Sequence, residues 1–357
     1  MGIHRPMQVT CTKYLMEGRR ARVRVPPDRN QTDGTWALVL AGGEGSRLRS
    51  LTTTRSGLAV PKQFCSLRGE FSLLEETILR SRGLVPTQRV CVVVAAQHRQ
   101  WWDHPLARLD RDNVIVQPRN RGTAIGILLP LLSILERDPN ARIVILPSDH
   151  HVQDEATLQR SLQSGLSAID RDPLGIALLG VDPECPDDEL GYIVPGESCG
   201  GDIYRVSRFV EKPSATAAQS LINQGGVWNV FIVIARARAL LHLIDRQCPG
   251  VVDYLRRAMR RASSSVLECD EVSDVYERLP DYDFSRHVAQ PAAASLRVLK
   301  VPQCGWSDLG TPRRVAEILT RPEPRRVTRT RPFGSVPNLN LAEQFACSAA
   351  VSLGADP

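Results

Sequence analysis

An alternation of short apolar runs with amphipathic segments constrains the fold more than any other feature of this sequence. Apolar runs predict buried strands at 36–41, 89–95, 114–117, 142–147 and 176–180. Amphipathic segments between them predict helices at 73–82, 123–136 and 155–169. Helical crossovers join parallel strands, and strands that are buried on both faces are apolar throughout. We therefore expect a Rossmann-like α/β fold, with a mostly parallel mixed sheet covered by helices on both faces.

The alternation becomes less regular after residue 180. Strands are predicted at 203–210, 227–235 and 296–301, and helices at 214–223, from 236 onward and at 312–320, with a helical insertion around 263–265. We expect three regions: a basic N-terminal arm (1–34), one globular domain (35–320) and a C-terminal tail (321–357). Within the tail, residues 336–357 add a short helix or none.

Composition places this chain among globular proteins, since 42% of its residues are hydrophobic. No apolar run approaches the roughly 20 residues that span a bilayer, and the N-terminus has no apolar signal core. We expect a cytoplasmic protein without a membrane partner. The nine cysteines include no C-x-x-C pair, so reduced thiols are expected rather than a disulfide framework or a zinc site.

The net charge of +6 comes from the two ends of the chain. Residues 1–34 carry seven Lys or Arg against three acidic residues, and residues 321–357 carry five against three, which leaves the domain between them near zero. A nucleic-acid-binding domain has a basic surface of its own. We therefore expect no nucleic-acid partner, with a solvated arm as the simpler interpretation of the basic N-terminus.

The most informative motif is a glycine-rich turn in the segment LAGGEGSRLRSLTTTRSGLAVPKQF, residues 40–64. The strand at 36–41 opens into Gly42, Gly43 and Gly45, whose lack of side chains lets backbone N–H groups approach phosphate oxygens. Arg47 and Lys62 add cations on either side of the loop. The spacing G-G-x-G-x-R fits neither the dinucleotide fingerprint nor the Walker motif. A purely structural turn is the alternative, which the downstream P-K-Q-F makes less attractive.

Two aspartates are candidate metal ligands. Asp149 follows the apolar strand at 142–147, where open α/β sheets place their ligand crevice, and Asp308 follows the strand at 296–301. Carboxylates suit Mg²⁺, although either residue alone could equally cap a helix or stabilise a turn.

Further motifs follow in a recognisable order. They are QPRNRGTAIG (117–126), LPSDH (146–150), LGYIVPG (190–196), FVEKP (209–213), WN (228–229) and GWSDLG (305–310). With the glycine-rich turn, this set resembles the sugar-nucleotide pyrophosphorylase family, in its mannose-1-phosphate guanylyltransferase branch. The resemblance implies transfer of a nucleoside monophosphate from an NTP, GTP in the first place, to a sugar 1-phosphate, mannose 1-phosphate in the first place, with Mg²⁺ as cofactor.

The resemblance also implies roles for particular residues. Catalysis would involve Arg47, Lys62, Asp149 and Asp308, the last two as metal ligands. The nucleotide would contact Leu40, Ala41, Gly42, Gly43, Gly45, Ser46, Arg47, Gln117, Gly122, Thr123 and Asp149. The sugar phosphate would contact Gly191, Tyr192, Glu211, Lys212 and Asn229. His150 and His151 are interpreted as structural, because a sugar phosphate is already ionised and needs no base.

The sequence departs from the family pattern in three places. Val230 and Phe231 follow Trp228-Asn229 where the family has Ser-Gly, which leaves the identity of the sugar open. The loop between Arg47 and Lys62 is longer than usual, with Ser50 where Pro is typical, and no isomerase module follows residue 321. A non-catalytic, nucleotide-sugar-binding regulatory subunit remains the alternative function. A homodimer is among the assemblies that the sequence allows.

Overall fold

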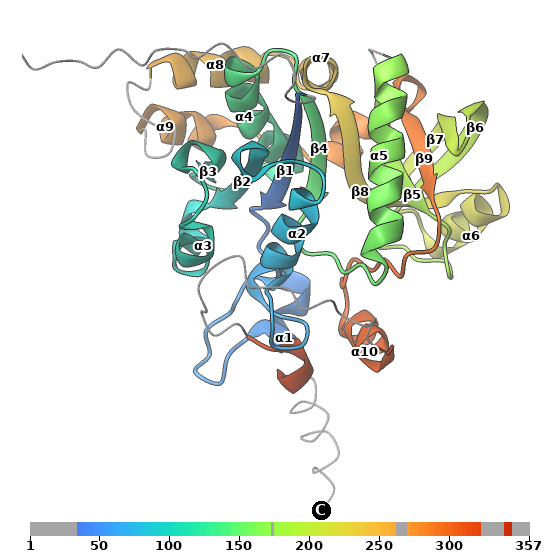
Figure 1. The fold of residues 1–357 in the computed structure, drawn as a ribbon, viewed down its shortest axis with the longest axis horizontal. Coiled ribbons are helices and arrows are strands. Elements are labelled where there is room, and N and C mark those ends of the chain that lie inside the picture. Colours follow the sequence, from blue (N-terminus) through green and yellow to red (C-terminus); the bar gives the residue numbers. More distant parts are fainter. Residues whose placement is uncertain (1–33, 173–174, 262–269, 323–338, 345–357) are drawn as a thin grey trace, which may run out of the picture. The chain divides into compact units, whose positions relative to one another are not determined.

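One nine-stranded sheet organises the described part of the chain, which in this computed structural model comprises residues 34–172, 175–261, 270–322 and 339–344. The strand order is β3-β2-β1-β4-β8-β5-β9-β7-β6, with an additional β8–β6 pairing (Figure 1). The strands are β1 (Thr35–Ala41), β2 (Val90–Ala95), β3 (Val114–Gln117), β4 (Arg142–Pro147), β5 (Ile176–Val181), β6 (Gly191–Gly200), β7 (Ile203–Glu211), β8 (Val227–Arg236) and β9 (Arg297–Val301). The predicted N-terminal arm lies outside the described residues.

Ten α-helices accompany these strands in the described ranges. They are α1 (Arg49–Thr52), α2 (Leu73–Arg82), α3 (Arg99–Leu106), α4 (Gly122–Arg137), α5 (Glu155–Arg171), α6 (Ala215–Asn223), α7 (Ala237–Gln247), α8 (Val251–Arg261), α9 (Asp270–Arg278) and α10 (Pro312–Thr320). None of them is long and apolar enough to cross a membrane. The predicted helices α2, α4, α5, α6, α7 and α10 are confirmed, whereas α3 and strand β6 were not predicted.

The sheet divides into a parallel part and a mixed part. Strands β3, β2, β1 and β4 are all parallel to their neighbours, as the alternating pattern predicts. Beyond β4, only β5 and β9 form a parallel pair, and the five other pairings are antiparallel. The expectation of a mostly parallel sheet is therefore wrong for this second part. Strands β6 and β7 are joined at Gly200-Gly201 as a hairpin, and a hairpin pairs only antiparallel.

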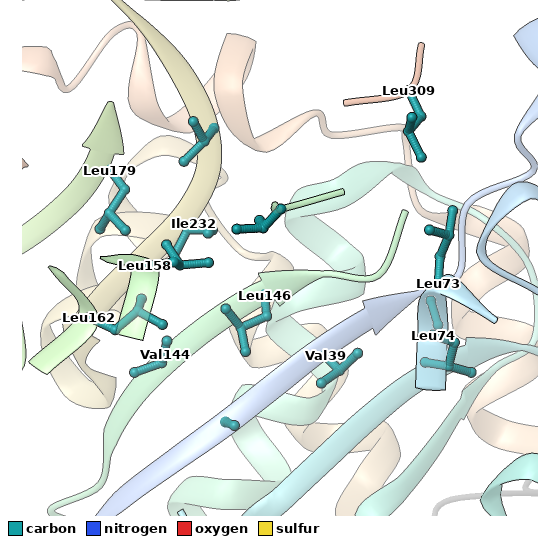
Figure 2. Close-up of a cluster of buried hydrophobic side chains, with 14 of the residues drawn as sticks. Val39, Leu73, Leu74, Val144, Leu146, Leu158, Leu162, Leu179, Ile232 and Leu309 are labelled. Atoms are coloured by element: carbon teal, nitrogen blue, oxygen red, sulfur yellow. The ribbon is translucent and has the colours of Figure 1, made fainter. Parts of the chain in front are cut away.

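Helices cover both faces of the sheet, as expected. Alternate residues of each strand point to opposite faces, so in β1 Val39 packs with α2 and α5 on one face, whereas Leu38 packs with α4 and α7 on the other. Figure 2 shows the first of these clusters, in which Val39, Val144 and Leu146 of the parallel strands lie among leucines of α2 and α5. The strand ends, and with them the candidate site, are held by this double-sided core.

Local signals explain where several helices begin. Ser72 and Glu75 form a reciprocal capping box at α2, and the Asp154 side chain accepts a hydrogen bond from Thr157 N at the start of α5. Of the C-terminal tail, residues 339–344 are described. Leu341 is fully buried, and its N–H donates to Ser66 O. The six described cysteines are unpaired thiols, four of them buried, in line with the sequence prediction.

Candidate active site

The glycine-rich turn leaves the carboxyl end of β1 and folds back over residues 62–64. Gly45 has a left-handed φ of 62°, and a Cβ atom there would lie 2.8 Å from the backbone nitrogen of Lys62. Gln63 fastens the turn, since its Nε2 donates to Ala41 O at 3.0 Å and to Gly43 O at 2.8 Å. Gln63 lies in the P-K-Q-F motif, which is the signal in the sequence for this role, although the motif alone does not predict it.

A cleft opens at the carboxyl ends of β1 and β4, beside this turn. Eight of the residues predicted to contact the nucleotide line it, namely Leu40, Gly42, Gly43, Gly45, Gln117, Gly122, Thr123 and Asp149. Gln63, Val93, Asn120, Gly126, Pro147 and Ser148 complete the lining. Ala41, Ser46 and Arg47 are close in sequence but do not line the cleft. Parallel strands bring their carboxyl ends to one edge, so this is the crevice that the fold predicts.

Gln117 and Gly122 shape the far wall of the cleft. The Gln117 amide lies so close to Gly42 that a Cβ on Gly42 would meet its Nε2 at 2.1 Å. Its Oε1 is buried and has no hydrogen-bond partner among the described residues, which leaves an acceptor for a ligand donor. Gly122 has a φ of 81° and begins α4 against the backbone of Tyr282. The Thr123 hydroxyl accepts from Phe284 N and donates to Asp283, so here it holds the chain segment that covers α4.

Lys62 is the buried cation of the site. Its side chain is 5% exposed, and its Nζ lies 2.9 Å from Asp149 Oδ2 and donates to Asp308 O at 2.6 Å. Burial alone would raise the pKa of Asp149, but the Lys62 charge and hydrogen bond, with His150, lower it to about 2. Asp149 is therefore ionised at neutral pH, and 40% of its side chain is exposed.

His150 is held as a neutral imidazole. Its Nδ1 accepts a hydrogen bond from Trp306 Nε1 at 3.3 Å, and its Nε2 lies 3.5 Å from Asp149 Oδ1. Burial lowers its pKa to about 4, although Asp149 opposes this effect. The backbone of His151 forms two hydrogen bonds with Ser307, which join the end of β4 to the segment that carries Asp308. Both histidines thus form contacts within the protein, and their interpretation as structural residues stays a prediction.

The Asp308 carboxylate forms an ion pair with Arg314 of α10. Its Oδ1 accepts from Arg314 Nη1 at 2.5 Å and from Gly310 N at 3.0 Å, and Arg314 also pairs with Asp187. Burial raises the pKa of Asp308, an effect that Lys62 opposes. Arg314 and Asp187 were not predicted, because nothing in the sequence relates α10 to the loop before β6.

The fit of a metal ion differs between the two predicted ligands. Asp149 presents a charged, accessible carboxylate beside the cleft, which suits Mg²⁺. The Asp308 carboxylate is directed at Arg314, so it joins the same ion only where Arg314 releases it. In the described part of the chain, no three His, Cys, Asp or Glu residues are grouped so that they could hold a metal by themselves. A metal here would complete its coordination with substrate phosphates and water.

Arg47 lies at the rim of the site and is held by a carboxylate of the protein. Its Nη1 is 2.5 Å from Glu189 Oε2, in the loop between β5 and β6, and both side chains are more than two-fifths exposed. An exposed pair of this kind contributes little to stability. It does give Arg47 an anionic partner that a phosphate would replace.

The residues predicted to contact the sugar phosphate come from β6, β7 and β8. Gly191 pairs with Glu211 across the β6–β7 ladder, and a Cβ on Gly191 would meet Glu211 Oε2 at 2.6 Å. The pKa of Glu211 is raised by burial and by Asp283. Lys212 is exposed, has a left-handed φ of 51° and forms no ion pair with the described residues.

Tyr192 and Asn229 are both buried, so little of either side chain is accessible to a ligand. Tyr192 is fully buried, and its hydroxyl accepts a hydrogen bond from Asp187 N at 2.8 Å. It therefore supports the loop that carries Glu189. Asn229 is 9% exposed and uses its Oδ1 to accept from Phe231 N at 3.1 Å, which leaves its amide group for other contacts.

A bulge in β8 explains the departure from the family pattern at Phe231. The β5–β8 register shifts between Leu178 and Gly180, opposite residues 229–233 of β8, and Phe231 has a left-handed φ of 56°. Bulky side chains rarely adopt this conformation, and glycine does so freely. The backbone thus keeps the conformation that suits the family's glycine, with a phenylalanine whose ring packs edge-to-face on Phe284.

Comparison with known proteins identifies the class to which this arrangement belongs. The family model described as "Nucleotidyl transferase" matches residues 36–321. The chain therefore belongs to the nucleotidyl transferase family, and the resemblance drawn from its motifs is confirmed.

Within this family, the chain is similar to two named relatives and to one solved structure. It is 29% identical to the mannose-1-phosphate guanylyltransferase of Escherichia coli over 77% of this chain and 58% of the relative. It is also 29% identical to the alginate biosynthesis protein AlgA of Pseudomonas syringae, over 76% of this chain and 56% of the relative. The chain thus spans less than three-fifths of the length of these relatives. A crystal structure titled "mannose-1-phosphate geranyltransferase", from Thermus thermophilus, superposes with a TM-score of 0.69 at 29% identity, covering 81% of this chain and 80% of the other.

Proposed function

We propose that this chain transfers GMP from GTP to mannose 1-phosphate, forming a nucleotide sugar and pyrophosphate. The observation that carries the proposal is the convergence of the glycine-rich turn and Asp149 on one cleft at the carboxyl ends of β1 and β4, with Lys62 paired to Asp149. Relatives that carry the name mannose-1-phosphate guanylyltransferase support the choice of substrates. The buried, unpartnered Gln117 Oε1 supports a base that offers hydrogen-bond donors, as guanine does.

The reaction needs positioning and charge more than acid–base chemistry. A phosphate oxygen of the sugar phosphate attacks the α-phosphorus of the NTP, the bond from that phosphorus to the β-bridging oxygen breaks, and pyrophosphate leaves with the electron pair. The attacking phosphate is already ionised at neutral pH, since its second pKa is near 6. No general base is required, in agreement with a neutral His150 whose pKa is about 4.

Each predicted catalytic residue has a task in this scheme. Backbone N–H groups of the glycine-rich turn approach the triphosphate, and Lys62 compensates the charge that develops on the transferred phosphoryl group. Arg47 leaves Glu189 and binds the departing pyrophosphate. Members of this family generally use a divalent metal, which when bound would neutralise phosphate charge. Asp149, and Asp308 once Arg314 releases it, would hold that metal.

On the acceptor side, Lys212 is the cation proposed to bind the phosphate of the sugar phosphate, because among the described residues no carboxylate pairs with it. Glu211 and the Asn229 amide would orient sugar hydroxyls, and Gly191 leaves room for them beside Glu211. Tyr192 would contribute indirectly, because its hydroxyl accepts a hydrogen bond from Asp187 N and so supports that loop. Phe231 replaces a small residue near this group, so the sugar preference is the part of the proposal that most needs a direct test.

The test is a substrate screen that measures pyrophosphate release with four NTPs, several sugar 1-phosphates and Mg²⁺. The proposal expects the highest kcat/KM for GTP with mannose 1-phosphate, and an Asp149→Asn variant that folds normally but loses most turnover. A preference for another pair would overturn the substrates and keep the reaction. Binding of GDP-mannose without turnover of any pair would overturn the reaction and favour a regulatory subunit of the same fold.

A further inference from the structure

A second cavity, larger than the cleft, lies at the opposite ends of the central strands, where β4, β5 and β9 begin. Its volume is about 640 Å³, within the range of small-molecule sites. The lining residues come from the amino ends of β4, β5, β7 and β9, the carboxyl end of the antiparallel β8, and one face of α7 (Figure 1). They are Pro139, Asn140, Ala141, Asp172, Ile176, Arg205, Arg236, Arg238, Ala239, His242, Leu243, Arg246, Ala294, Ser295 and Arg297. We call this cavity the arginine pocket. The length of β4, about 20 Å for six residues, separates it from the cleft.

The charges of the arginine pocket do not balance. Five arginines line it. Three have carboxylate partners: Arg297 pairs with Asp172 at 3.0 Å, Arg205 with Glu197 at 3.3 Å and Arg236 with Asp170 at 3.8 Å. Within the described residues, Arg238 and Arg246 form no ion pair, and Arg238 Nε donates to Pro139 O at 2.7 Å. Like charges that share a concave surface repel one another unless an anion compensates them. The unbalanced cations therefore favour a bound anion.

Arg236 provides the most specific sign of a missing partner. Its Nε is buried and lacks any hydrogen-bond partner in the described chain. Its nearest carboxylate, Asp170, is 3.8 Å from Nη2 and already pairs with Arg142 at 2.5 Å. A buried donor without a partner costs free energy, which a ligand oxygen in the pocket recovers once the Arg236 side chain turns its Nε toward it.

The start of α7 adds backbone donors to the same place. Arg236 is the N-cap residue of this 11-residue helix and supplies no side-chain cap, and the first turn has no acidic residue. Ala237 N is taken by Ala141 O, whereas the following residues Arg238 and Ala239 line the pocket. A helix N-terminus attracts anions through its uncapped N–H groups and its dipole. Arginine side chains, an orphaned donor and a helix start thus point to one anionic group.

We propose that the arginine pocket binds a small phosphorylated molecule, with its phosphate between Arg236, Arg238 and the start of α7. Arg246, two turns further along the same face of α7, contacts a second charged oxygen or phosphate. The pocket also contains the apolar side chains of Ile176 and Leu243, which an organic body such as a base or sugar covers. Arginine forks match phosphate oxygens in geometry as well as charge. A nucleic-acid backbone is disfavoured, because the site is a cavity rather than an extended basic stripe.

The experiment measures binding of three probes by calorimetry at fixed ionic strength: GDP, mannose 1-phosphate and inorganic phosphate. The variant Arg238→Gln/Arg246→Gln changes two exposed side chains, and Arg236→Gln removes the buried donor. Arg82→Gln on α2 is the matched control, an exposed arginine outside the pocket that forms no ion pair with the described residues. Lys62→Met removes the cation that pairs with Asp149 beside the cleft, so it separates binding at the two sites.

For at least one probe, the proposal expects a Kd that rises about tenfold or more in both pocket variants and stays within twofold in Arg82→Gln and Lys62→Met. A preference for GDP or mannose 1-phosphate over inorganic phosphate identifies the organic body. The proposal is overturned if no probe binds, if Lys62→Met abolishes all binding, or if Arg82→Gln weakens it equally. Binding of a ten-nucleotide DNA strand, lost in the pocket variants while the three probes do not bind, would likewise overturn it in favour of nucleic acid.

Discussion

The candidate active site and the arginine pocket both collect cations, yet they do so in opposite ways. At the active site, every proposed catalytic cation has a carboxylate of the protein beside it: Lys62 has Asp149, and Arg47 has Glu189. In the arginine pocket, cations outnumber carboxylates. A site with its own counter-charges is held in shape before substrate arrives and exchanges partners on binding. A site without them depends on its ligand for charge balance, so the same substitution should have opposite consequences in the two places.

The largest effect is expected for Lys62→Met, which keeps the buried stem but removes the charge between Asp149 and Asp308 O. Loss of such a donor costs about 2.7 to 4 kcal/mol in the transition state, or roughly a hundredfold to a thousandfold in kcat. Pyrophosphate release measures it. Arg49→Met, an exposed cation of α1, is the control and should stay within twofold. A decrease below about fivefold would mean that Lys62 has only a structural role.

Arg314→Met tests the internal counter-charges of the cleft through stability. Arg314 lies between Asp308 and Asp187, and all three side chains are less than a fifth exposed. Removing it leaves two buried carboxylates without a cation, so the free energy of unfolding should fall by about 3 kcal/mol. Urea unfolding measures this change. Its neighbour Arg313 is 87% exposed, and Arg313→Met should change stability by less than about 0.5 kcal/mol. Equal effects of the two variants would contradict the cluster.

Glu189→Gln should improve nucleotide binding slightly. The substitution frees Arg47 from its exposed partner, and such pairs are worth about 0.2 to 1 kcal/mol. The KM for the NTP should therefore fall by at most about fivefold, with kcat unchanged. Steady-state kinetics with the acceptor saturating decides the matter, and a higher KM would show that Glu189 itself assists substrate binding.

Arg238→Gln should give the smallest effect, of opposite sign to that of Arg314→Met. Because Arg238 forms no ion pair among the described residues and lies in the first turn of α7, where a cation opposes the helix dipole, its removal relieves repulsion and should raise stability by a few tenths of a kcal/mol at low salt. Thermal unfolding at low and high ionic strength checks this, since screening removes the gain. A loss of stability at low salt would mean that the pocket is balanced after all.

How much could be predicted from the sequence follows the same division of the molecule. The runs that form β1 and β4 are apolar after their first residue, so the parallel part of the sheet and its glycine-rich turn could be predicted. The place of Asp149 at the edge of that sheet followed from the strand end alone. The antiparallel part could not be predicted, since β6 is polar over its second half and β8 enters between β4 and β5 from a distant segment.

The missed residues share a physical cause. Arg314 and Asp187 are 127 positions apart, and only the fold brings them together. The arginine pocket draws on segments from Pro139 to Arg297. The summed net charge of the central domain is near zero. This total is correct, but it does not reveal the local excess of arginines in the arginine pocket. Such a cluster forms only when distant segments pack together, so it cannot be detected from composition.

The bulged strand β8 joins the predicted sugar-phosphate residues to the arginine pocket. Asn229 lies near its start and Arg236 at its end, with the left-handed Phe231 between them. A bulge bends its strand and increases the local twist. If a ligand at Arg236 changed the affinity for the sugar phosphate by some factor, the sugar phosphate would by thermodynamic reciprocity change the affinity for that ligand by the same factor.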